Sequence, residues 1–137
     1  MTAMLSRDEL IALSHTAYFD GCNNHDLEGI LATMSADCVM RFTAASYTYI
    51  GTDSMRAHFN DFLSNFPTIN FHNYVSVVDV ELQTIATHFT VTLIDKGGDT
   101  LEMRNCNFFT TDENGLFNDV LIFNSSPLKA GFEAGSA

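Results

Sequence analysis

Basic residues are scarce in this chain. Lys and Arg together number 6 against 17 Asp and Glu, which gives a formal net charge of −11. Nucleic acids and anionic membrane surfaces are bound mainly through clustered Lys and Arg. The sequence therefore predicts no nucleic-acid partner and no membrane partner. A small neutral or aromatic ligand, or another protein, fits this composition better.

Cysteine is rare, and long apolar runs are absent. No segment approaches the roughly 18 consecutive apolar residues of a membrane-spanning helix. Cys22, Cys38 and Cys106 are too far apart in sequence for a C-x-x-C redox pair or a zinc knuckle. An odd number of cysteines and the lack of an apolar leader predict a cytoplasmic protein.

Histidines are few and scattered, which bears on metal and cofactor binding. His15, His25 and His58 fall on expected helices or caps, without metal-ligand spacing to one another. We therefore expect no metal site and no cofactor.

Apolar material, in contrast, is plentiful. Hydrophobic residues make up 46% of the 137 residues, with twelve Phe and no Trp. A chain of this size and composition closes one core without disulfide or metal support. We expect a single domain over residues 1–126 and a flexible tail over residues 127–137, where apolar periodicity is lost.

Hydrophobic spacing predicts helices first and strands afterwards. The capping box from Ser6 to Glu9 starts a helix over residues 7–23, and Asp26 and Thr52 are expected to cap two more. The other two helices are expected over 26–35 and 52–66, and the strands over 38–43, 71–82, 85–95, 101–111 and 116–125. Turns are expected at Gly97-Gly98 and Asn114-Gly115. The predicted fold class is α+β, with a strongly curved mixed sheet wrapped around three helices like a cone.

Strand alternation separates the side chains into two faces. One face of residues 101–109 is apolar with Asn105 and Asn107 set into it. Asparagine is unfavourable inside strands, and two amides on one apolar face need partners, so we place this face in a cavity. On the preceding strand we place His88 and Thr90 in the cavity wall, because theirs is the polar face. A shift of one residue in the register of this strand would instead turn Arg104 inward and favour an anion site.

Several motifs resemble one known family. They are Tyr18, residues 25–31 (HDLEGIL), residues 35–40 (SADCVM), residues 51–59 (GTDSMRAHF) and the turn at Asn114-Gly115. The chain resembles the nuclear transport factor 2-like superfamily with its cystatin-like fold, and within it the ketosteroid-isomerase and SnoaL-like polyketide-cyclase branch. The resemblance covers nearly the whole chain and implies the cone-shaped fold.

The resemblance also implies roles for individual residues. Tyr18 falls at the oxyanion-stabilising tyrosine of ketosteroid isomerases, and Asn107 at their second oxyanion donor. The position of their general-base aspartate holds Phe42, which cannot move a proton. His72 resembles a catalytic histidine of scytalone-dehydratase-like members, and His88 is the competing candidate for the base.

The sequence thus supports two hypotheses. The first is a cofactor-free isomerase, cyclase or dehydratase that acts on a small hydrophobic carbonyl compound, with Tyr18, His72 and Asn107 as catalytic residues. The second is a non-catalytic ligand-binding or dimerisation module. The expected substrate-binding residues are Phe42, Met55, Phe59, His88, Thr90, Met103, Asn105 and Phe109. We also expect a homodimer, formed by apolar faces that carry Phe89, Val91, Leu93 and Phe108.

Overall fold

Three helical segments and six strands make up the computed structural model, which describes residues 4–125. The first helical segment is continuous and consists of α1 (Arg7–Ala12), η1 (Leu13–Phe19) and α2 (Asp20–Asn23); the others are α3 (Leu27–Leu31) and α4 (Thr52–Asn65). The strands are β1 (Met34–Phe42), β2 (Tyr47–Ile50), β3 (Thr68–Asp79), β4 (Thr84–Ile94), β5 (Thr100–Thr111) and β6 (Phe117–Asn124). The tail expected at residues 127–137 lies outside the described residues.

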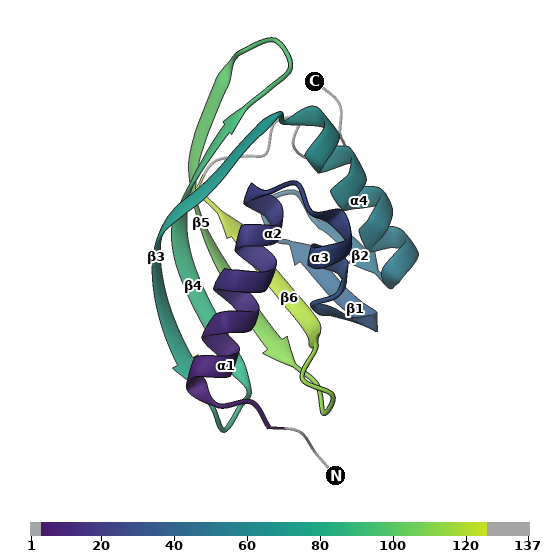
Figure 1. The fold of residues 1–137 in the computed structure, drawn as a ribbon, viewed down its shortest axis with the longest axis vertical. Coiled ribbons are helices and arrows are strands. Elements are labelled where there is room, and N and C mark those ends of the chain that lie inside the picture. Colours follow the sequence, from purple (N-terminus) through teal and green to yellow (C-terminus); the bar gives the residue numbers. More distant parts are fainter. Residues whose placement is uncertain (1–3, 126–137) are drawn as a thin grey trace.

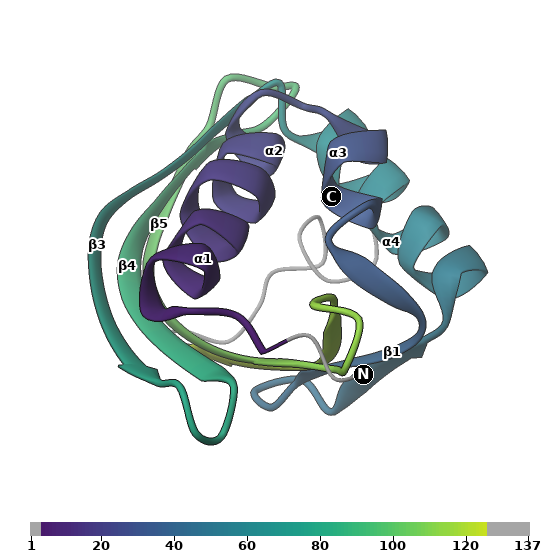
Figure 2. The same ribbon diagram turned by 60° about the horizontal axis from the view of Figure 1, so that its bottom comes forward.

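One mixed sheet contains all six strands, in the order β2-β1-β6-β5-β4-β3. Only the β1–β6 pair is parallel; every other neighbouring pair is antiparallel. The sheet bends around the first helical segment, and α3 and α4 cover the end formed by β1 and β2 (Figures 1 and 2). This is the expected α+β cone, with its helices on the concave face.

Local sequence signals explain where the helices begin. The Ser6 hydroxyl accepts from the Glu9 backbone N–H, and the Glu9 carboxylate accepts from the Ser6 N–H, so the expected capping box is present. Asp26 caps α3 by accepting from the Gly29 N–H. The expectation for α4 was wrong by one residue, because the capping position is Gly51. Its φ of 86° is a conformation that glycine adopts without steric cost.

Three elements differ from the expected pattern. α3 is shorter than the predicted helix, because its chain enters β1 at Met34. β2 was not expected, and it pairs with β1 along the edge of the sheet. The first helical segment also widens into a π-helical stretch at η1, which the apolar spacing does not signal. Tertiary packing overrides weak local preferences at each of these places.

The alternation on β5 is confirmed, whereas the assignment on β4 was inverted. Asn105 and Asn107 are buried on the concave face, and Arg104 is exposed on the convex face. On β4, the buried side chains are Ile85, Thr87, Phe89, Val91 and Leu93. These residues therefore face the core, and the polar face of β4 points away from it.

No helix within residues 4–125 is long and apolar enough to cross a membrane.

Candidate functional site

A small cavity lies between the concave face of the sheet, the first helical segment and α4. It is lined by Tyr18, Phe42, His58, Phe59, Phe62, Phe71, Phe89, Asn105, Asn107 and Ile122. Its volume is about 20 Å³. That is room for about one water molecule, so aromatic side chains must move aside to admit an organic ligand.

Two asparagines from β5 supply amide groups to this cavity. Asn107 is 2% exposed, and its Oδ1 has no hydrogen-bond partner within the described part of the chain. Asn105 is 6% exposed, and its Oδ1 accepts a hydrogen bond of 2.8 Å from Asn124 Nδ2. A buried amide oxygen without a partner costs about 1–3 kcal/mol of stability. The unpartnered Asn107 Oδ1 therefore lowers the stability of the unliganded protein. A ligand that donates a hydrogen bond to this oxygen would restore that stability.

His58 is the ionisable imidazole of the cavity. It belongs to α4 and is 8% exposed. Its ring centroid lies 4.3 Å from that of Tyr49 and 5.2 Å from that of Phe42. Burial lowers the pKa of His58 to about 4. The imidazole is therefore neutral at physiological pH and keeps one nitrogen as a proton acceptor.

Tyr18 lies where the hydrophobic core meets the cavity, and it belongs to both. Its ring packs edge-on against Phe59 and Phe109, with ring centroids 6.0 and 5.1 Å away. Burial, followed by the adjacent Cys22 and Cys38 thiols, holds the pKa of Tyr18 well above its ordinary value. The hydroxyl, which hydrogen-bonds to the Cys22 thiol, thus stays protonated and can serve as a hydrogen-bond donor.

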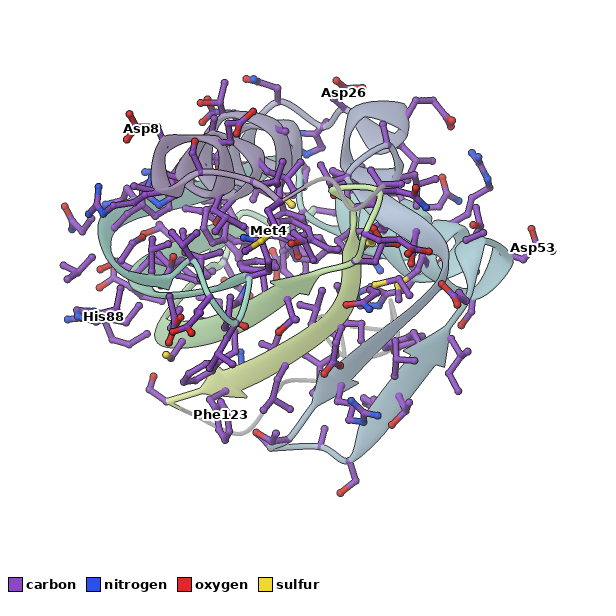
Figure 3. The ribbon with its side chains drawn as sticks, turned by 90° about the horizontal axis from the view of Figure 1, so that it is seen from below. Met4, Asp8, Asp26, Asp53, His88 and Phe123 are labelled. Atoms are coloured by element: carbon purple, nitrogen blue, oxygen red, sulfur yellow. The ribbon has the colours of Figure 1, made fainter. Side chains whose placement is uncertain are left out.

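The two histidines expected in the site do not line this cavity. His72 on β3 bonds to Thr92 Oγ1 at 3.2 Å, and Thr92 in turn donates to exposed Glu102 on the convex face. His88 is exposed and lies beside Arg104 on the same face, pointing away from the core in Figure 3. Thr90 shares this face of β4. The expectation that His72, His88 and Thr90 reach the cavity was wrong, because β4 turns its apolar side chains inward.

The remaining expected contacts divide into lining and core residues. Phe42 and Phe59 line the cavity together with the asparagines. Met55, Met103 and Phe109 are buried but do not line it. Phe109, for example, stacks on Phe117 with ring centroids 4.6 Å apart. The expected contact of these three residues with a substrate therefore stays a prediction, and it requires side chains around this narrow cavity to move.

Five lining residues were not expected from the sequence, and His58 is the one that matters most for chemistry. The missed residues are His58, Phe62, Phe71, Phe89 and Ile122. A signal for His58 exists, because it lies on the same helical stripe as Met55, Phe59 and Phe62. A lone histidine within an apolar stripe is buried with that stripe.

Within the part of the chain that the structure describes, no group of three or more His, Cys, Asp or Glu side chains could hold a metal ion.

Several solved structures are similar to this fold over most of the chain. PrhC from Penicillium brasilianum NBRC 6234 is 20% identical, with 87% of this chain and 82% of that chain covered at a TM-score of 0.75. BvnE pinacolase from Penicillium brevicompactum is 20% identical, with 91% and 88% covered at a TM-score of 0.75. A protein of unknown function with a cystatin-like fold from Methylobium petroleophilum PM1 is 20% identical, with 96% and 85% covered at a TM-score of 0.75. These likenesses confirm the cystatin-like fold.

The family is established by sequence. A search of curated proteins finds no match. The SnoaL-like domain family, however, matches residues 15–120, a stretch that runs from η1 to β6 and includes nine of the ten lining positions. The expected resemblance to the SnoaL-like branch is therefore confirmed, and the chain belongs to the SnoaL-like domain family.

Proposed function

We propose that this protein is a cofactor-free isomerase or cyclase that acts on a small hydrophobic carbonyl compound in the cavity. The observation that carries the proposal is the unpartnered, buried Oδ1 of Asn107 in a cavity that also contains a neutral imidazole. Membership in the SnoaL-like family and the likeness to a structure named pinacolase support the same reaction class.

His58 takes the role of proton acceptor that sequence analysis gave to His72. A neutral imidazole can remove a proton from the carbon next to a carbonyl group and return it to another carbon. This step converts the ketone to an enolate and then to its isomer, with no net loss of atoms. Because Phe42 cannot move a proton, His58 is the base that the cavity offers in its place.

Hydrogen-bond donors in the cavity stabilise the enolate oxygen. Tyr18 supplies a hydroxyl that burial keeps protonated, and Asn105 supplies an amide NH2. Such donors, fixed in an apolar cavity, stabilise developing negative charge more strongly than water does. The phenylalanines around them bind the hydrocarbon part of the substrate and exclude solvent.

The test is proton exchange on a minimal probe, cyclohex-3-en-1-one, followed by NMR in D2O. The expected result is deuterium incorporation next to the carbonyl and conversion to the conjugated ketone. Replacement His58→Gln is expected to lower this rate by about 10²- to 10⁴-fold, and Asn105→Leu by about 10²-fold.

His88→Gln is the matched control, because it makes the same change on the convex face and should leave the rate unchanged. Binding of the probe without any exchange would contradict catalysis and favour a ligand-binding module. Full activity of His58→Gln would exclude His58 as the base.

We also propose that the protein is a homodimer, formed through the convex face of the sheet. Strand register places two rows of mostly apolar side chains side by side on that face. One row is Val77, Ala86, Phe108 and Leu121, and the other is Val75, His88, Cys106 and Phe123. We call these two rows the outer apolar band. Val77 is 71% exposed and Phe108 is 41% exposed, which is unfavourable in water.

Charges beside the outer apolar band favour a second copy of the chain as its partner. Arg104 flanks one side of the band and Asp119 the other. A twofold axis that crosses the strands would bring Arg104 of one copy toward Asp119 of the other, whose carboxylate also pairs with Arg41 of its own chain at 2.8 Å. Phe108 was expected in the interface, whereas Phe89, Val91 and Leu93 are buried in the core and cannot contribute to it.

A further inference from the structure

Asn105 lies beside a second amide, Asn124 of β6, and this contact determines how its carboxamide is oriented. Asn124 Nδ2 donates to Asn105 Oδ1 at 2.8 Å and also approaches Met103 Sδ at 3.6 Å. A thioether sulfur can accept a hydrogen bond but has no proton to donate. The side of Asn124 that faces Met103 is therefore its NH2 group.

The orientation of Asn105 follows from that of Asn124. Because Asn124 presents its NH2 group, the atom of Asn105 that faces it must be an acceptor, which is Oδ1. The NH2 group of Asn105 is then left for the cavity, which Asn105 lines. Asn124 does not line the cavity itself, so it acts on a ligand only through Asn105.

The neighbouring amide, Asn107, presents the opposite kind of group. Its buried Oδ1 has no partner among the described residues and can only accept. Residues two apart on one face of a strand are separated by about 7 Å. A ligand that meets both amides must therefore carry its own acceptor and its own donor close together.

We propose that Asn124 is a positioning residue that fixes Asn105 as a donor, so that the cavity selects compounds with a carbonyl group and a hydroxyl or enol group on carbons 1 and 3. The carbonyl oxygen accepts from Asn105 Nδ2, and the hydroxyl donates to Asn107 Oδ1. This inference deepens the proposed function and rests on it in one respect, namely that the cavity binds a carbonyl compound.

The first experiment measures the affinity of three probes by NMR titration of the full chain. The probes are 3-hydroxycyclohexanone, cyclohexanone and cyclohexanol. Each lost hydrogen bond is expected to weaken binding about tenfold. 3-Hydroxycyclohexanone should therefore bind about tenfold more tightly than either of the other two. Equal affinity for all three probes would overturn the assigned substrate class.

The decisive variant is Asn124→Asp, because a carboxylate can only accept. It should force Asn105 to rotate its NH2 group toward position 124 and turn Oδ1 into the cavity. Affinity for cyclohexanone should then fall about tenfold, while affinity for cyclohexanol is kept. Asn118→Asp makes the same change at an exposed position of β6 and serves as the control. Unchanged binding of cyclohexanone to Asn124→Asp would overturn the proposal.

A measurement without ligand separates this proposal from the proposed function. Nuclear Overhauser contacts are expected between the Asn124 side-chain NH2 protons and the Met103 methyl group. If these contacts are present and no probe binds, the orientation of Asn105 holds and the proposed function fails. If they come from the Asn105 NH2 protons instead, the orientation is reversed and the proposal is overturned. This readout also serves if Asn124→Asp fails to fold.

Discussion

The concave and convex faces of β4 and β5 consist of alternating residues of the same strands, yet their chemistry differs. The concave face buries Phe89, Phe109 and both cavity asparagines. The convex face exposes His88, Arg104 and Phe108. The two faces contain similar residue types, each with aromatic rings and polar groups. Residue type therefore does not decide function here; burial does, because it removes water from competition for each polar group.

Histidine shows this difference most directly. His58 is enclosed by aromatic rings, and burial lowers its pKa to about 4. His72 and His88 lie on the convex face, with hydrogen-bond partners Thr92 and Arg104. The same side chain is thus a neutral acceptor inside the cone and a surface group outside it.

The largest effect on stability is expected at Phe109, which we compare with its neighbour Phe108 on the other face of β5. Phe109 is fully buried and Phe108 is 41% exposed. Phe109→Ala should destabilise the protein by about 3–5 kcal/mol, because it leaves a cavity in the core. Phe108→Ala should cost less than about 1 kcal/mol. Denaturant unfolding followed by circular dichroism measures both, and a larger loss for Phe108→Ala than for Phe109→Ala would mean that the two faces of β5 are reversed.

An intermediate effect is expected from the pH dependence of stability. The folded protein resists protonation of His58 down to a pKa of about 4, whereas the unfolded chain takes up the proton near 6.5. The contribution of His58 to the free energy of unfolding is therefore complete above pH 6.5, and it is lost as the pH falls toward 4. Relative to His58→Gln, the wild type should lose about 3 kcal/mol across this range.

Urea unfolding at pH 4, 5, 6 and 7 measures this loss. His88→Gln is the matched control, because it makes the same substitution at an exposed position of β4. A constant difference between wild type and His58→Gln would show that His58 titrates normally in the folded state.

The smallest effect on folding is expected at the outer apolar band. Replacing Phe108 and Phe123 by Lys should change the free energy of unfolding of one chain by only about 0.5 kcal/mol per site. Sedimentation velocity should nevertheless shift from a dimer to a single 15.2 kDa species. A wild type that sediments as a monomer at micromolar concentration would exclude the proposed homodimer.

Much of the fold was predictable, because its signals are local or periodic. Ser6 and Asp26 mark the starts of helices through short-range hydrogen bonds. The turns at Gly98 and Gly115 have φ values of 88° and 74°, a conformation that favours glycine. The inward direction of Asn105 and Asn107 follows from alternation with buried Met103 and Phe109.

The candidate site was predictable only in part. Tyr18, Phe42, Phe59, Asn105 and Asn107 were expected in it and do line the cavity. His72 was placed there by resemblance and His88 by the polarity of its strand face, and neither reaches it. The face of a strand is fixed by the partner strands and helices that cover it, and polarity alone does not identify that face.

By itself, the sequence determined that this chain forms a curved sheet with helices on one face and two amides directed inward. Periodicity, capping residues and turn residues act over a few positions, so they can be recognised without the rest of the fold. Only the tertiary structure decided that α4 brings His58 to the cavity and that Asn124 of β6 fixes Asn105 of β5. The His58 contact joins elements that are distant in sequence, and it exists only because the sheet bends around the helices. The Asn105–Asn124 contact lies across the β5–β6 hairpin and depends on the strand register, which pairs these two residues directly.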